Sequence, residues 1–196
     1  MNLFSPPELR CNTHLIVRPA TQAAPYSITA RPDPCWQMDV LNKGFILQPG
    51  AGVGYLRCHI VNLSYPNYLA IGLVHTEASV RDNQWPGADG VDSACCWKGD
   101  RCVHWSLLPI MEPCSRSVQF GQRGDRVTLV LDCRAMPVLR LLVNERLLVA
   151  HPLGSLGPIT LCPAIALKGC PAVSEDQQTC VELESAPLPR GWDAPL

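Results

Sequence analysis

The stretch Gly124-Asp125-Arg126-Val127-Thr128-Leu129-Val130-Leu131-Asp132-Cys133 decides the fold class of this chain. Val127, Leu129 and Leu131 share one face of an extended chain, and mostly polar residues alternate with them. That period of two is expected of a half-buried β-strand. After a short polar break, Leu139-Arg140-Leu141-Leu142-Val143 forms a second apolar stretch, which ends at Asn144-Glu145. The two stretches predict two strands, the second closed by a tight turn.

Stretches of this kind recur about every ten residues along the chain, with turn signals between them. The 19 prolines leave little room for a long helix. We therefore expect an all-β fold, an antiparallel two-sheet β-sandwich with almost no helix. The expected strands lie near residues His14–Val17, Tyr26–Thr29, Trp36–Val40, Phe45–Leu47, Val53–Asn62, Tyr68–Val74, Ser93–Trp97, Cys102–Trp105, Arg126–Cys133, Val138–Asn144, Arg146–Ala150, Ile159–Leu167 and Thr179–Glu184.

The composition limits the class of protein. With 196 residues, 47% of them hydrophobic and 17% charged, the chain fits one globular domain. A net charge of -1 and the lack of any Lys/Arg run predict no direct binding of nucleic acid. No apolar segment approaches the roughly 20 residues that span a bilayer, so we expect no membrane insertion.

The cysteines indicate a compartment. The chain has 11 of them, without a C-x-x-C pair, and its first residues show no signal-peptide pattern. We therefore expect reduced, mostly buried thiols and an intracellular, cytoplasmic location.

The order of the strands resembles a SPRY domain. The stretch 124–133 resembles the family's "GD-x-V-x-L-x-L-D" strand, 139–145 its "L-x-F-x-x-N-G" strand, and 159–167 its "L-x-P-A-I-x-L" strand. Earlier stretches also match: they are Gly54–Ile60, Tyr68–Val74 and Gly90–Asp100. The resemblance covers roughly Gly44 to Glu184. It implies a concanavalin-like jelly roll that serves as a recognition module.

The chain departs from the family pattern at several positions. Asn144-Glu145 replaces the usual Asn-Gly turn, which requires positive φ and strains Glu by about 1 kcal/mol relative to Gly. Leu142 replaces the usual aromatic residue, and Arg57 or His59 stands where an acidic residue is usual. These departures indicate a divergent member.

The domain organisation is expected to be simple. Residues 1–12 form an N-terminal extension, residues 13–185 a single SPRY-like β-sandwich domain, and residues 186–196 a Pro-rich C-terminal tail. The tail contains one Trp and is either frayed or docked on the domain or on a neighbour.

The resemblance implies that loops at one end of the sandwich bind a partner protein. The relevant loops are 75–92 and 98–123, with 18–34 and 151–158 as walls. Trp85 lies in a polar, turn-rich context, so it is either a plug that holds its loop down or an exposed anchor. Trp105, with His104 and Arg101, follows the matched segment and is expected to line the binding surface. Main-chain groups and Asp100 would orient the bound segment.

We expect neither a metal nor any other cofactor. Cys95, Cys96, Cys102 and His104 are the one dense set of metal-type ligands in the sequence. Adjacent Cys95 and Cys96 on a strand point to opposite faces, so they would not both reach one ion. The sequence contains no recognisable catalytic motif, which argues against an enzyme.

The leading hypothesis is a non-catalytic protein-protein interaction module, an adaptor or a subunit of a larger complex. One alternative is a carbohydrate-binding, lectin-like domain, in which Trp85 or Trp105 would stack on a sugar ring. Another is a purely architectural subunit whose surface is buried in an assembly.

Overall fold

The computed structural model describes most of the chain between Leu15 and Asp193. Side chains of Phe45 and of the segments 93–98 and 101–104 are not described, and every structural statement below concerns the described part. That part comprises residues 15–21, 25–41, 45–65, 68–76, 83–86, 93–98, 101–104, 122–153, 159–184 and 186–193.

All the strands expected from the sequence are present, and their ends differ from expectation by at most two residues. Within the described ranges the only helix is the short 3-10 helix η1, Glu175–Gln177. The strands are β1 (Leu15–Arg18), β2 (Tyr26–Ala30), β3 (Trp36–Val40), β4 (Phe45–Leu47), β5 (Gly52–Asn62), β6 (Leu69–His75), β7 (Ser93–Lys98), β8 (Arg101–His104), β9 (Arg126–Cys133), β10 (Val138–Val143), β11 (Arg146–Pro152), β12 (Ile159–Lys168) and β13 (Cys180–Leu183).

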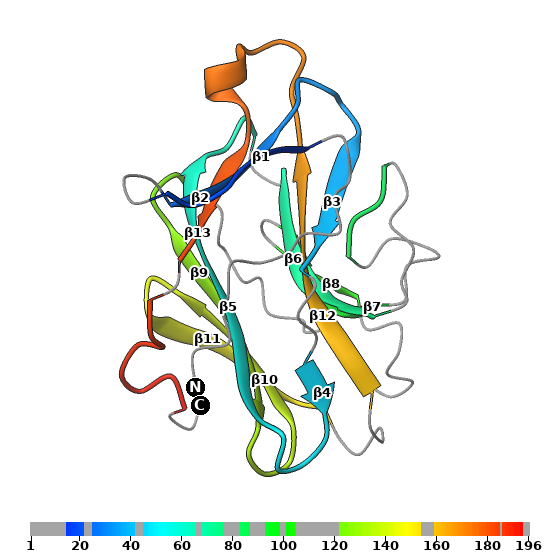
Figure 1. The fold of residues 1–196 in the computed structure, drawn as a ribbon, viewed down its shortest axis with the longest axis vertical. Coiled ribbons are helices and arrows are strands. Elements are labelled where there is room, and N and C mark those ends of the chain that lie inside the picture. The colour runs from blue at the N-terminus through cyan, green and yellow to red at the C-terminus, as the bar shows by residue number, and fades with distance from the viewer. Residues whose placement is uncertain are drawn as a thin grey trace.

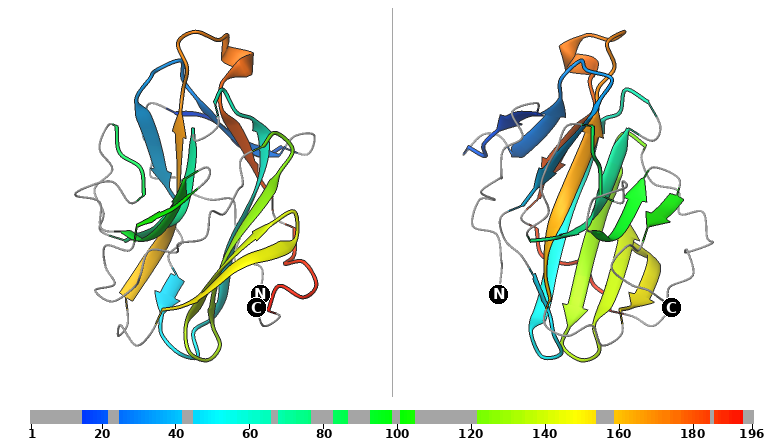
Figure 2. Two further views of the ribbon diagram at one scale, coloured as in Figure 1. Left: turned by 180° about the vertical axis from the view of Figure 1, so that it is seen from behind. Right: turned by 90° about the vertical axis from the view of Figure 1, so that its right-hand side faces the viewer.

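The strands form two antiparallel sheets that face each other (Figures 1 and 2). The seven-stranded sheet has the order β1-β2-β13-β5-β9-β10-β11. The six-stranded sheet has the order β3-β12-β6-β7-β8, and β4 also pairs with β12. Because β13 lies between β2 and β5, the last strand belongs to the same sheet as the first strand, β1. This architecture confirms the predicted antiparallel β-sandwich.

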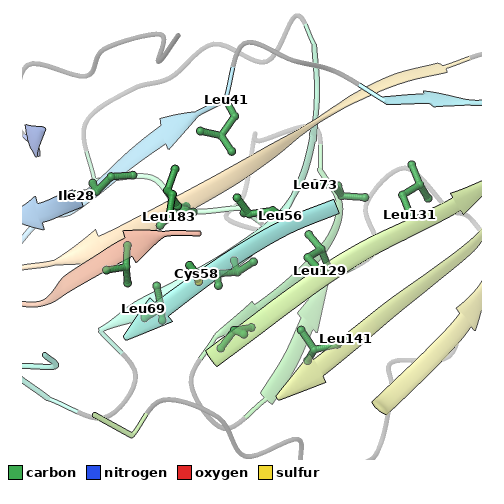
Figure 3. Close-up of a cluster of buried hydrophobic side chains, with 14 of the residues drawn as sticks. Ile28, Leu41, Leu56, Cys58, Leu69, Leu73, Leu129, Leu131, Leu141 and Leu183 are labelled. Atoms are coloured by element: carbon green, nitrogen blue, oxygen red, sulfur yellow. The ribbon is translucent and has the colours of Figure 1, made fainter. Parts of the chain in front are cut away.

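The main core fills the space between the sheets (Figure 3). On β5, Leu56, Cys58 and Ile60 point into it and are at most 1% exposed, as the alternation predicted. Leu69 and Leu73 of β6 meet them from the six-stranded sheet. Burial of each large aliphatic side chain contributes about 1.5–3 kcal/mol, so this two-sided cluster is the main source of stability.

The turn between β10 and β11 has the geometry expected for an Asn-Gly turn although it carries Glu. Asn144 and Glu145 have φ of 50° and 67°, and Val143 pairs with Arg146 across the turn. The Asn144 side chain supports the turn, because its Oδ1 accepts from the Arg126 amide at 2.9 Å and its Nδ2 donates to Asp125 at 2.8 Å. The predicted positive φ at Glu145 is confirmed.

Two polar side chains of β3 lie on the inner face of the six-stranded sheet. Trp36, Met38 and Val40 belong to a cluster on the outer face, so Gln37 and Asp39 alternate inward. Asp39 is 1% exposed, and neither carboxylate oxygen has a well-formed hydrogen bond among the described residues. Burial raises the pKa of Asp39 from 3.8 to about 7, against a smaller opposing effect of the Val40 amide.

Candidate partner-binding surfaces

The outer face of the six-stranded sheet is apolar where it crosses β3, β12 and β6. An antiparallel sheet with one face on the core usually presents polar side chains on its other face. An apolar outer face therefore needs another part of the protein packed over it. Every residue of this outer patch is at most 8% exposed, which shows that it is covered. Its members are Trp36, Met38, Val40, Ala70, Val74, Cys162, Ala164 and Ala166.

Trp85 forms part of the cover. Its ring centroid lies 6.2 Å from that of Trp36, at an interplanar angle of 43°. The loop is tied to the start of β3, because the Trp36 amide donates to Asn83 Oδ1 at 3.1 Å and the Asn83 amide donates to the Trp36 carbonyl at 3.0 Å. Asn83 has a φ of 60°, a conformation that Asn adopts more readily than most residues. Trp85 is half-buried, so one part of it packs down while another part meets solvent.

The β7–β8 hairpin continues this sheet to its edge. Arg101 pairs with Lys98, and His104 pairs with Cys96. The register shifts between these pairs, so β8 has one extra residue and both positions fall opposite the same face of β7. That face is the outer one, because Lys98 is opposite Ala70 of the outer patch. Positions 101 and 104 therefore lie on the same face of the sheet as Trp85, but at the opposite edge from β3, on which Trp85 packs.

Two of the five expected binding residues cannot be placed. Asp100 and Trp105 lie outside the described residues, as do most of the loops 75–92 and 98–123. For Arg101 and His104 the backbone position is known, and for Trp85 the side chain as well.

The outer face of the seven-stranded sheet carries a strap that the sequence left undecided. Residues 186–193 lie along this face (Figure 2, red). Leu188 and Trp192 pack against a cluster that contains Tyr55 and Leu142. The Tyr55 hydroxyl donates to the Ala186 carbonyl at 3.2 Å. This part of the tail is therefore docked on its own domain.

A buried arginine and its acidic partners hold the start of the strap. The Arg57 side chain, 8% exposed, lies 2.8 Å from Glu184 and 3.1 Å from Glu145, and it donates to the Pro187 carbonyl at 3.2 Å. Arg126 also pairs with Glu184, at 2.9 Å. Because the guanidinium is desolvated, removal of a single partner would leave a poorly compensated charge.

A second charged group holds the end of the strap. Asp132 accepts from Arg134 at 3.0 Å and from Arg140 at 2.9 Å, and the hydrogen bonds from Arg134 hold the pKa of Asp132 below its usual value. Both guanidinium groups lie over the Trp192 ring, at 4.8 and 5.6 Å from its centroid, and Arg134 pairs with Asp193 at 3.2 Å. These charges have a structural role, since they pair with one another and with Trp192 and Asp193 of the strap.

The cysteines whose side chains the structure describes are free thiols; they are Cys35, Cys58, Cys133, Cys162, Cys170 and Cys180. Complete burial raises the pKa of Cys58 to about 12, so it acts as a small hydrophobic residue. Among the described residues no three His, Cys, Asp or Glu side chains gather as metal ligands would. No helix in the described part of the chain is long and apolar enough to cross a membrane.

Comparison with known proteins establishes the fold. No family model matches the sequence, and no curated protein matches it. Solved structures do match. The SPRY domain of human HERC1 is 13% identical, with a TM-score of 0.54 over 80% of this chain and 86% of that one.

Two further structures agree. A human SPRY domain is 15% identical, with a TM-score of 0.53 over 88% of this chain and 95% of that one. The PSpry domain of TRIM65 is 12% identical, with a TM-score of 0.53 over 88% and 86%. The predicted SPRY-like fold is confirmed, in a sequence that has diverged widely from these structures.

Proposed function

We propose that this SPRY-fold chain is a non-catalytic module that binds a segment of a partner protein. The proposed binding surface is the outer face of the six-stranded sheet, from the loop of Trp85 at β3 to the β7–β8 edge, together with the loops beside it. Trp85, Arg101, His104 and Trp105 bury one or two side chains of the partner, and Asp100 orients the bound segment.

The observation that carries this proposal is the register of the β7–β8 hairpin. Positions 101 and 104 share the outer face of the sheet, and Trp85 packs on the same face. Three of the five proposed residues, Trp85, Arg101 and His104, thus have positions on one side of one sheet, which supports the proposal. Trp85 lies on Trp36 of β3, at the opposite edge of this face from β8. Trp and Arg dominate the binding energy at many interfaces.

The partner and the setting follow from the same features. An extended segment suits the edge strand, since within the described residues β8 pairs only with β7. Six described free thiols support a reducing, intracellular setting, and we propose that the chain works there as a subunit of a larger complex.

The test is selection from a library of displayed peptides, followed by measurement of the dissociation constant by fluorescence anisotropy. We expect the double variant Arg101→Ala/Trp105→Ala to weaken binding at least tenfold, because loss of a hot-spot residue costs about 2 kcal/mol or more. Circular dichroism and thermal unfolding would check that the variant folds.

A matched control removes one aromatic residue and one arginine elsewhere. Tyr65 is 51% exposed and Arg190 is also exposed, so Tyr65→Ala/Arg190→Ala should leave binding unchanged. Equal binding by all three proteins would refute the proposed surface. Selection of no peptide, with specific binding on a glycan array, would favour the lectin alternative. Partners retained from cell extract by both variants would favour an architectural subunit.

A further inference from the structure

A groove lies on the seven-stranded sheet, away from the proposed loop site. It is bounded by η1, the orange coil at the top of Figure 1, and by the outer face of β1, β2, β13 and β5. Its volume is about 480 Å³, within the range of ligand-binding clefts. The strap covers Tyr55, Val130 and Leu142 on this sheet, and none of these lines the groove.

Strand pairing builds the floor of the groove. Ile16 pairs with Thr29, Thr29 with Cys180, and Cys180 with Asn62, which forms one row across four strands. The next pair is Val181 with Ile60, so Val61 is an extra residue in β5. This β-bulge adds Val61 to the lining of the groove, where it is only half-buried. The floor therefore has two apolar residues, Ile16 and Val61, among small polar ones.

The charges around the groove are unequal. Glu175 and Asp176 lie exposed in η1, and neither carboxylate forms an ion pair with another described residue. Arg18, at the end of β1, also has no ion pair within the described part of the chain. Glu182, two residues after Cys180 on the same face of β13, lies 3.4 Å from His59 and already has this partner. The groove thus has an acidic wall at η1 and a single cation at β1.

We propose that this groove binds a lysine or arginine side chain of a partner protein segment. The methylene stem of such a side chain packs on Ile16 and Val61, as long cationic side chains do on apolar surfaces. Its charged end reaches Glu175 and Asp176, which form charge-assisted hydrogen bonds with it. Arg18 repels a cation at the other end, so the stem enters from β1 and the head lies at η1. This docking point is separate from the loop site and does not depend on it.

The test is a titration followed by ¹H–¹⁵N NMR, with acetyl-Ala-Lys-Ala-amide and its arginine analogue as probes. We expect shifts of the amides of residues 16–18, 29, 61–62 and 175–180 at millimolar concentrations, as for a single anchoring side chain. Glu175→Gln/Asp176→Asn should weaken binding about five- to tenfold, the effect of two exposed ion pairs. The same spectra report whether the variant is folded.

Two controls isolate the chemistry. The norleucine analogue keeps the stem and lacks the charge, so it should bind about as weakly as lysine binds to the variant. Asp193→Asn removes a carboxylate from an exposed ion pair outside the groove and should leave binding unchanged. Four results would overturn the proposal. The norleucine or a glutamate analogue could bind as tightly as lysine, or the control variant could lose as much binding as Glu175→Gln/Asp176→Asn. The lysine peptide could also shift amides outside the groove, or shift none.

Discussion

Asp39 is expected to make stability fall as pH rises. Its carboxyl is buried on the inner face of β3, and burial raises its pKa from 3.8 to about 7. Each pKa unit corresponds to about 1.4 kcal/mol, so ionisation of Asp39 in the folded protein costs about 4 kcal/mol. Replacement of Asp39 by Asn removes the ionisation and keeps the size of the side chain.

The sign of the effect follows from proton binding. Well below pH 4 the carboxyl is protonated in both states and contributes nothing. Between pH 4 and 7 the folded state binds more protons than the unfolded state, so the free energy of unfolding falls with rising pH. Above pH 7 the full penalty is present. Relative to the wild type, Asp39→Asn should therefore gain about 4 kcal/mol between pH 4 and pH 8.

Urea unfolding of both proteins at several pH values would measure this gain. The difference between the two proteins is the useful quantity, because other titrating groups contribute equally to both. Any constant cost of the buried Asn amide also cancels between pH values. Gln37→Leu, at the other inward position of β3, removes a buried polar group that does not titrate, so its stability difference should not vary with pH. A pH-independent difference for Asp39→Asn would refute the reasoning.

Three further substitutions test the packing. Gly169→Ala should cost about 1–3 kcal/mol in urea unfolding, because the added Cβ would overlap the Arg31 carbonyl; an unchanged midpoint would contradict this close approach. Gln178→Leu should cost about 2–3 kcal/mol, because it strips the buried Cys170 amide and carbonyl of partners at 2.8 Å, and a neutral result would mean that these groups find others. Trp192→Ala should cost about 1–2 kcal/mol and speed proteolysis within residues 186–193, whereas an unchanged cleavage rate would show that the strap is held without this ring.

The strands were predictable because each carries its own alternation of apolar and polar residues. In β5 the pattern places Leu56, Cys58 and Ile60 on one face, and the structure buries that face. The same pattern cannot show which strands pair. The position of β13 between β2 and β5, and hence the bulge at Val61, depends on partners that lie far away in sequence.

The candidate site was predictable only in part. The turn-rich context of Trp85 left open whether it is a plug or an anchor, and its half-burial against Trp36 depends on a contact between distant segments. Docking of the tail through Trp192 depends on Arg134 and Arg140, which the sequence does not connect to it. The binding roles of Trp85, Asp100, Arg101, His104 and Trp105 all stay predictions.

The ion pair between Arg57 and Glu145 links two departures from the family pattern that seem unrelated in sequence. Arg57 or His59 stands where the SPRY pattern has an acid, and Glu145, where that pattern has Gly, supplies the carboxylate that meets the Arg57 guanidinium. Glu at a positive φ is unfavourable by itself, and Arg in a buried position is unfavourable without acids around it. The two residues are therefore expected to change together during evolution. Alignments of divergent relatives should show positions 57 and 145 covarying, and a score that treats each column separately would count one compensated exchange as two mismatches.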